Sequence, residues 1–232
     1  MRLIHSFNAF LKNHVNLNQT RVDKAKETSE TLTSFVKNAE PTSPLFMSTA
    51  PQGSIRQGTI IKPRTDETEF DVDLLLRLKH QQGWSARNYL DVVEAAFLAS
   101  DRYKDMVNPD GNRCVTIEYV GDFHVDVVPS VEINGQCWIM NHQSNQFELT
   151  DGDGYANWFS QQNAKTNAHL AKVVRLAKYL RDHHAWEAKS ILLTTLLGRQ
   201  VSAADTATTF PDVPTTLFVL TTRLDAWLQG QL

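Results

Sequence analysis

The stretch from Phe70 to Leu78 constrains the fold more than any other part of the chain. Apolar residues alternate there with Asp71, Asp73 and Arg77, which is the period-two pattern of a β-strand with one buried face. The two aspartates therefore project from the same face. A second strand is predicted over 123–131, with Asp126 on one face and valines on the other. Aspartate is disfavoured in strands, so three acids on two apolar strands indicate a charged site on a sheet.

Composition limits the class of protein. The chain has 232 residues, of which 41% are hydrophobic, enough for the core of one large domain or two small lobes. Its 23 basic residues do not exceed its 26 acidic ones, so a small ligand is favoured over a long nucleic acid held by charge. Cys114 and Cys137 predict neither a disulfide framework nor a zinc site, and we expect buried thiols. Without a secretory leader or an apolar run of about 18 residues, the chain is expected to be cytoplasmic, with no membrane partner.

Periodicity divides the chain into a helical entry, a β-rich middle and a helical end. A long helix is predicted over 18–37, and Pro41 stops it shortly afterwards. Another helix is predicted from Ser85 to about residue 100. Short strands are predicted over 45–50, 58–62 and 113–119, the last joined to 123–131 at Gly121-Asp122. Beyond about residue 150 the pattern is helical, over 170–177, 191–197 and 215–228. We expect an α+β fold with a catalytic core over 1–150 and a helical lobe over 151–232.

The three acids are the ligand set that a pair of Mg²⁺ ions requires. Two such ions about 4 Å apart need shared anionic oxygens, and Asp71, Asp73 and Asp126 supply them. Apolar neighbours make uncompensated carboxylates costly, which also favours neutralisation by metal. The alternative is that these are solvated acids at the edge of a sheet.

Gly53-Ser54 is a candidate phosphate cradle. Glycine lets the backbone approach a ligand closely, and the amides and hydroxyl that follow can donate to phosphate oxygens. An ordinary turn is the alternative reading of this dipeptide. Its significance lies in its position shortly before the paired aspartates.

The motifs in this order resemble those of a known family. The segments are Pro51-Gln-Gly-Ser-Ile-Arg-Gln-Gly-Thr-Ile-Ile-Lys-Pro63, Glu69-Phe-Asp-Val-Asp-Leu74, Phe123-His-Val-Asp-Val-Val-Pro129 and Asp151-Gly-Asp-Gly-Tyr-Ala-Asn-Trp-Phe159. They resemble the bacterial cyclic-oligonucleotide synthases related to animal cyclic GMP-AMP synthase and oligoadenylate synthase. Segments 173–178 and 189–194 are similar to that family's paired helices, in which a lysine and a serine contact the donor triphosphate.

The resemblance implies a two-lobed, polymerase-β-like nucleotidyltransferase with a mixed sheet in its catalytic lobe. It implies that Asp71, Asp73 and Asp126 are catalytic and hold two Mg²⁺ or Mn²⁺ ions. Gly53 and Ser54 would bind the terminal phosphates. Further nucleotide contacts are implied for a second set of residues, namely Gln52, Lys178 and Ser190. Lys178 lies at the rim of an apolar helix face, where its ammonium is expected to reach a cleft. The alternatives are an ordinary surface lysine at position 178 and a helix cap or an interior hydroxyl at Ser190.

The same resemblance implies an activity and partners. The chain would join ribonucleoside triphosphates into a cyclic di- or trinucleotide, releasing pyrophosphate, and the product would activate a separate effector in bacterial anti-phage signalling. An activating protein is a further implied partner. Members of the family are generally longer, so we expect either a helical lobe truncated at its C-terminus or a short variant of the family, with an incomplete acceptor side. The alternatives are transfer of a single nucleotide to an RNA, protein or small molecule, and a non-catalytic nucleotide sensor.

Histidines and aromatic residues give weaker signals. His124 is expected to lie beside Asp126 on the same strand face and to shape the site. His183 and His184 are adjacent on a helix and point about 100° apart, so they are not expected to share a metal. Residues Tyr155 to Phe159 are expected to pack within the second lobe rather than to stack on a base.

Overall fold

The computed structural model describes residues 2–64, 69–119 and 123–231, and these form two compact units. The sheet unit comprises Gln19–Arg56 and Thr65–Gly152, and the helical unit comprises Met1–Asn18, Gln57–Arg64 and Asp153–Leu232. The division expected near residue 150 differs from this one in two segments. Residues 1–18 and 57–64 belong to the helical unit, because Leu11, Val15 and Ile61 pack into its core.

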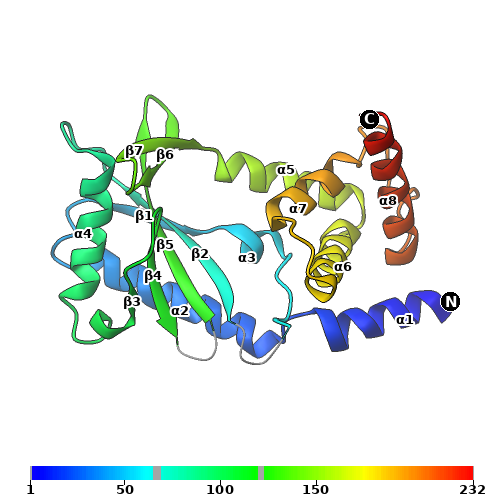
Figure 1. The fold of residues 1–232 in the computed structure, drawn as a ribbon, viewed down its shortest axis with the longest axis horizontal. Coiled ribbons are helices and arrows are strands. Elements are labelled where there is room, and N and C mark those ends of the chain that lie inside the picture. The colour runs from blue at the N-terminus through cyan, green and yellow to red at the C-terminus, as the bar shows by residue number, and fades with distance from the viewer. Residues whose placement is uncertain (1, 65–68, 120–122, 232) are drawn as a thin grey trace. The chain divides into compact units, whose positions relative to one another are not determined.

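The sheet unit is built on a mixed sheet (Figure 1). Its main path runs β1-β2-β5-β4-β3, and β5 also pairs with β6, which pairs with β7. The strands are β1 (Phe46–Pro51), β2 (Phe70–Leu78), β3 (Val107–Asn108), β4 (Val115–Tyr119), β5 (Phe123–Ile133), β6 (Gln136–Asn141) and β7 (Gln146–Thr150). The central strands β2 and β5 run parallel, and the other pairs are antiparallel. This confirms the mixed sheet and places the predicted acid-bearing strands next to each other.

Two helices cover the apolar face of this sheet. Helix α2 (Gln19–Asn38) ends before Pro41 as predicted, and α4 (Ala86–Leu98) begins after Ser85, whose backbone N–H donates to Asn88 Oδ1 at 2.9 Å. Phe35 of α2 contacts the rings of Phe97 and Tyr103, which joins the two helices. The polar face of the central strands therefore lies on the opposite side from these helices. The short helices α3 (Gly53–Gln57) and η2 (Lys104–Met106) complete the unit.

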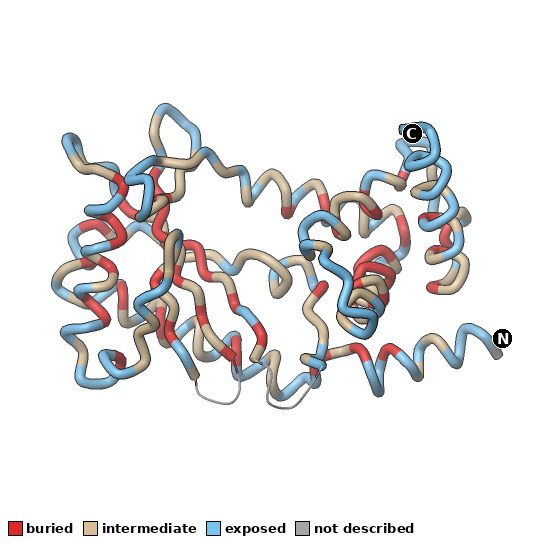
Figure 2. Tube along the Cα trace, viewed as in Figure 1, coloured by how far each residue is buried: buried red, intermediate tan, exposed pale blue. Residues whose placement is uncertain are grey.

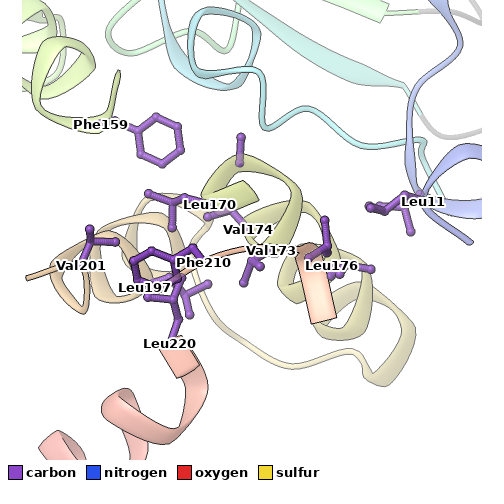
Figure 3. Close-up of a cluster of buried hydrophobic side chains, with 13 residues drawn as sticks. Leu11, Phe159, Leu170, Val173, Val174, Leu176, Leu197, Val201, Phe210 and Leu220 are labelled. Carbon is purple, nitrogen blue, oxygen red and sulfur yellow. The ribbon is translucent and has the colours of Figure 1, made fainter. Parts of the chain in front are cut away.

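The helical unit has its own core. Its elements are α1 (Arg2–Phe10), the π-helix η1 (Leu11–Val15), α5 (Gly152–Lys165), α6 (His169–His184), α7 (Ser190–Arg199) and α8 (Val213–Gln229). Helix α6 contributes more of the buried side chains than any other element, and they meet Phe159, Leu197, Phe210 and Leu220 (Figure 3). In Figure 2, buried positions likewise gather on α6 and on the sheet strands. Asp212 caps the N-terminus of helix α8, where its Oδ1 accepts from the Thr215 N–H at 2.8 Å.

Several sequence predictions need correction. No strand forms over 58–62, because that segment bonds to the helical unit instead of to the sheet: the Lys62 N–H donates to the Val15 carbonyl at 2.8 Å. Cys114 and Cys137 are half-buried rather than buried. The predicted turn at Gly121-Asp122 lies outside the described residues. Within the described ranges, no helix combines the length and apolar character that crossing a membrane needs.

Candidate active site

The register of the central strands brings the predicted acids together. Strands β2 and β5 are parallel and pair Asp73 with Asp126 and Asp71 with His124. Paired residues on neighbouring strands point to the same face of a sheet. Two of the three acids are therefore direct neighbours, and the third is two residues along β2. The apolar residues between them, such as Val72 and Val125, are fully buried on the other face.

Gly53 lies directly against one of these acids. It has a φ of +58°, a left-handed conformation, and a Cβ built on it would lie 1.9 Å from Asp73 Oδ2. The neighbouring Gln52 N–H donates to the Asp73 carbonyl at 2.9 Å, which fixes the start of α3 on β2. Gly53 of the predicted phosphate cradle thus lies beside one of the acids in the sheet unit. Position 53 accepts only a residue without a side chain.

Gln52 has a side chain that is poised for a ligand. Its Nε2 is buried and finds no hydrogen-bond partner among the described residues. Its amide lies against Gly152, where a Cβ would be 2.7 Å from Oε1. A buried donor without a partner is costly, so a ligand acceptor at this atom would remove that cost.

Asp126 is held by a residue that sequence reasoning missed. Thr116, its register partner on β4, donates from Oγ1 to Asp126 Oδ1 at 2.5 Å. The Cys114 Sγ lies 3.5 Å from the same hydroxyl. Burial, and then the nearby Asp126 carboxylate, raise the pKa of Cys114 to about 11. The only available signal was a polar residue between buried Val115 and Ile117, which places Thr116 on the polar face.

Asp71 has a different neighbour. Its Oδ1 lies 3.2 Å from His124 Nε2, and the other ring nitrogen of His124 lies 3.7 Å from Glu69 Oε2. His124 therefore shapes the site as predicted, but through Asp71 rather than Asp126. Among the described residues, no three histidine, cysteine or acidic side chains form a preassembled metal cluster. The donor set itself, three carboxylates beside a glycine cradle, suits Mg²⁺, which prefers carboxylate oxygens.

The two predicted phosphate contacts of the helical unit lie differently from expectation. Lys178 is only 5% exposed, and its Nζ donates to the Thr59 carbonyl at 3.0 Å and to Thr59 Oγ1 at 3.3 Å. Its ammonium thus anchors a neighbouring segment and is not directed into a cleft as predicted. Ser190 begins α7, and its Oγ accepts from Arg181 Nη1 at 2.8 Å. Arg181, which the sequence pattern did not single out, is the cation beside Ser190.

The aromatic residues of α5 pack inside the helical unit, as expected. Phe159 is in the core, and the Tyr155 hydroxyl lies 3.0 Å from Thr195 Oγ1. Trp158 lies against Gly198, where a Cβ would be 2.7 Å from its ring. These contacts join α5 to α7.

Known proteins resemble this chain in sequence and in fold. A family model, the Second Messenger Oligonucleotide or Dinucleotide Synthetase domain, matches residues 1–163. The chain belongs to this synthetase family. A curated relative, a c-di-GMP synthase of Roseivirga ehrenbergii, is 32% identical over 114 residues, which are 47% of this chain and 30% of the relative. The chain thus aligns with less than a third of that relative's length.

Solved structures share the fold of this chain. The Escherichia coli MS115-1 CdnC structure with ATP has a TM-score of 0.73 at 21% identity, covering 95% of this chain and 71% of CdnC. Bradyrhizobium diazoefficiens CdnG in complex with GTP has a TM-score of 0.75 at 18% identity, covering 99% of this chain and 80% of CdnG. These likenesses confirm the predicted α+β, polymerase-β-like fold.

Proposed function

We propose that this chain is a metal-dependent nucleotidyltransferase that joins ribonucleoside triphosphates into a cyclic di- or trinucleotide and releases pyrophosphate. The observation that carries the proposal is the pairing of Asp73 with Asp126 on parallel strands, with Gly53 against the Asp73 carboxylate. The family match supports the same activity.

The residues divide into two roles in this proposal. Asp71, Asp73 and Asp126 would hold two Mg²⁺ ions, which when bound lower the pKa of the attacking hydroxyl and offset the charge of the leaving pyrophosphate. Asp71 would turn from His124 toward the other acids. Thr116 fixes one oxygen of Asp126, so that carboxylate has a single preferred orientation.

The remaining predicted residues would bind the nucleotide. The backbone amides that follow Gly53, with the Ser54 hydroxyl, would donate to the terminal phosphates. Gln52 would donate from its buried Nε2 to the nucleotide. Ser190 and Lys178 remain proposed contacts to the donor phosphates, and Lys178 would first have to release Thr59.

Two partner proteins are proposed, on the basis of the family resemblance and of a complex formed by a structural relative. The E. coli relative CdnC is also known in a complex with a HORMA protein. We propose that this chain likewise responds to an activating protein, and that its product activates a separate effector in anti-phage signalling.

The activity can be tested directly. The protein is incubated with the four labelled ribonucleoside triphosphates and Mg²⁺ or Mn²⁺, treated with phosphatase, and its products are identified by mass spectrometry. We expect a phosphatase-resistant cyclic product that Asp73→Asn abolishes. Asp101→Asn is the matched control, because it makes the same change in the same unit on a side chain that is 98% exposed.

Three outcomes would count against the proposal. A nucleotide attached to an added RNA, protein or small molecule would assign the enzyme to single-nucleotide transfer. Equal product from Asp73→Asn and wild type would remove the acids from catalysis. Nucleotide binding with no release of pyrophosphate under either metal would favour a sensor.

A further inference from the structure

The helical unit contains a cavity that the catalytic proposal does not use. Its volume is about 420 Å³, within the range of small-molecule sites. Its polar and aromatic lining comes from three segments of the chain: Asn13 and His14 of η1, Lys62 and Arg64 after α3, and Tyr179 and His183 of α6. All three segments belong to the helical unit.

One wall is a π-helix. The five residues of η1 continue α1, and the Asn16 N–H donates to the Leu11 carbonyl at 2.8 Å, closing the wide turn. Leu11 and Val15 are buried in the core of the unit, so the turn is held on its inner side. Asn13 and His14 lie between them and line the cavity. Such turns are rare and occur frequently at functional sites.

A second wall is held by buried contacts. Lys178 donates to Thr59, and the Lys62 N–H donates to the Val15 carbonyl. Arg64 Nη1 reaches the Asp182 carbonyl at 3.4 Å. The segment over 57–64 is therefore fixed to both η1 and α6 although it contains no strand. It presents the side chains of Lys62 and Arg64 from a positioned backbone.

The third wall is aromatic. The rings of Tyr179 and His183 are nearly parallel, 7° apart, with centroids at 6.1 Å. Phe10 packs edge-on against Tyr179, with centroids 5.2 Å apart, which restrains the tyrosine ring. Planar ligand groups bind well against such ring faces.

The charges of the cavity favour an anion. Lys62 and Arg64 are cationic, and His14 and His183 add two imidazoles. The acidic lining residue, Asp182, has its carboxylate paired with Arg181 at 2.6 Å. A lysine beside an arginine is a common arrangement for phosphate, because guanidinium donates two hydrogen bonds to it.

We propose that this cavity is a second nucleotide site, whose lining includes none of the three acids. The phosphates lie at Lys62 and Arg64, and the base lies against Tyr179 and His183. The same chemistry is presented by a nucleoside triphosphate and by a cyclic dinucleotide. The site stands independently of the catalytic proposal, because its binding is measured without turnover.

The test measures binding with the catalytic site disabled. Equilibrium dialysis of labelled ATP and of labelled cyclic di-GMP is performed on the Asp73→Asn protein in EDTA. We expect a Kd for the better ligand that rises at least about tenfold when Lys62→Gln and Arg64→Gln are added. The matched control adds Lys172→Gln and Arg199→Gln, which also removes one lysine and one arginine from the helical unit but outside the cavity.

A second comparison tests the base. Tyr179→Leu keeps an apolar side chain against Phe10, and it should weaken nucleotide binding while leaving tripolyphosphate binding unchanged. Tighter binding of ATP would identify the ligand as a nucleoside triphosphate, and tighter binding of cyclic di-GMP would identify it as a product; either supports the site. Equal losses in the cavity and control variants, or no binding of either nucleotide, would overturn it. Thermal melting of each variant shows whether a loss reflects unfolding.

Discussion

Alanine at position 53 would place a methyl group onto the carboxylate of Asp73. The Cβ would lie 1.9 Å from Asp73 Oδ2 and 2.9 Å from Cγ, whereas real Cβ atoms essentially never lie within 3.0 Å of another heavy atom. The carboxylate or the start of α3 must therefore shift by about 1.1 Å, which is the difference between the 3.0 Å limit and the 1.9 Å distance to Oδ2. Asp73 is paired in register with Asp126, so a shift changes the spacing of the two acids.

Two effects of Gly53→Ala can be separated by magnitude. The left-handed backbone costs alanine about 1–2 kcal/mol of folding free energy. A displacement of about 1 Å in a positioned catalytic group costs on the order of a hundredfold in rate. We expect pyrophosphate release to fall about a hundredfold while the free energy of unfolding falls by only about 1–2 kcal/mol. Initial rates and urea denaturation measure the two quantities.

Gly58→Ala is the matched control. Gly58 has a φ of +64°, close to that of Gly53, but a Cβ there meets nothing within 4 Å. It should lose about the same stability, about 1–2 kcal/mol, and keep its rate. If the two variants had equal rates, contact with Asp73 would not be what requires glycine at position 53.

Three further predictions follow from individual contacts. Thr116→Val, which removes the donor to Asp126, should lower the initial rate about tenfold, and Thr116→Ser should restore it; a valine variant at full rate would contradict the role. The Arg223 hydrogen bonds lower the pKa of Asp205, so their stabilisation is present above about pH 4 and is lost as the pH falls through the folded-state pKa. Asp205→Asn should therefore lower the free energy of unfolding at pH 7 by roughly 1 kcal/mol, a modest value because Arg223 is 36% exposed. In urea denaturation the difference between the variant and the wild type should vanish in acid, and a difference that stays constant with pH would refute the linkage. Because the pKa of Cys114 is about 11, iodoacetamide at pH 8 should label it much more slowly in native than in unfolded protein, and peptide mass spectrometry would reveal rapid native labelling if the reasoning fails.

Sequence reasoning succeeded where the information was local. The alternation in β2 and β5 located both strands, and β2 has the predicted bounds, because one face of each strand is buried. The proline after α2 and the serine before α4 marked helix ends through their effects on the backbone. The nearness of Gly53 to the acids was expected from the family motif rather than from periodicity.

Features that depend on contacts between distant parts of the sequence could not be predicted. The parallel register that pairs Asp73 with Asp126 depends on a connection of more than forty residues, and no local pattern encodes it. The contact of Thr116 with Asp126 could not be predicted, because it depends on the register in which β4 pairs with β5. The segment over 58–62 has β-forming residues, yet contacts with Val15 and Lys178 satisfy its backbone in place of a ladder. The contact with Thr59 also explains why the Lys178 ammonium is not directed into a cleft as predicted.

The division of the helical unit among three separate stretches of sequence affects how the chain folds during synthesis. The sheet unit is complete once Gly152 has been synthesised. Leu11 and Val15, by contrast, cannot be buried until α6 and α8 have been synthesised. Contacts over such long separations form slowly, so α1 and η1 expose apolar surface on the ribosome for most of translation. A fragment beginning at Gln19 would give an intact sheet unit but leave a gap in the helical core, and a fragment of residues 153–232 would lack that core's N-terminal part. Expression of separate lobes therefore needs residues 1–18 and 57–64 grafted onto the second of them.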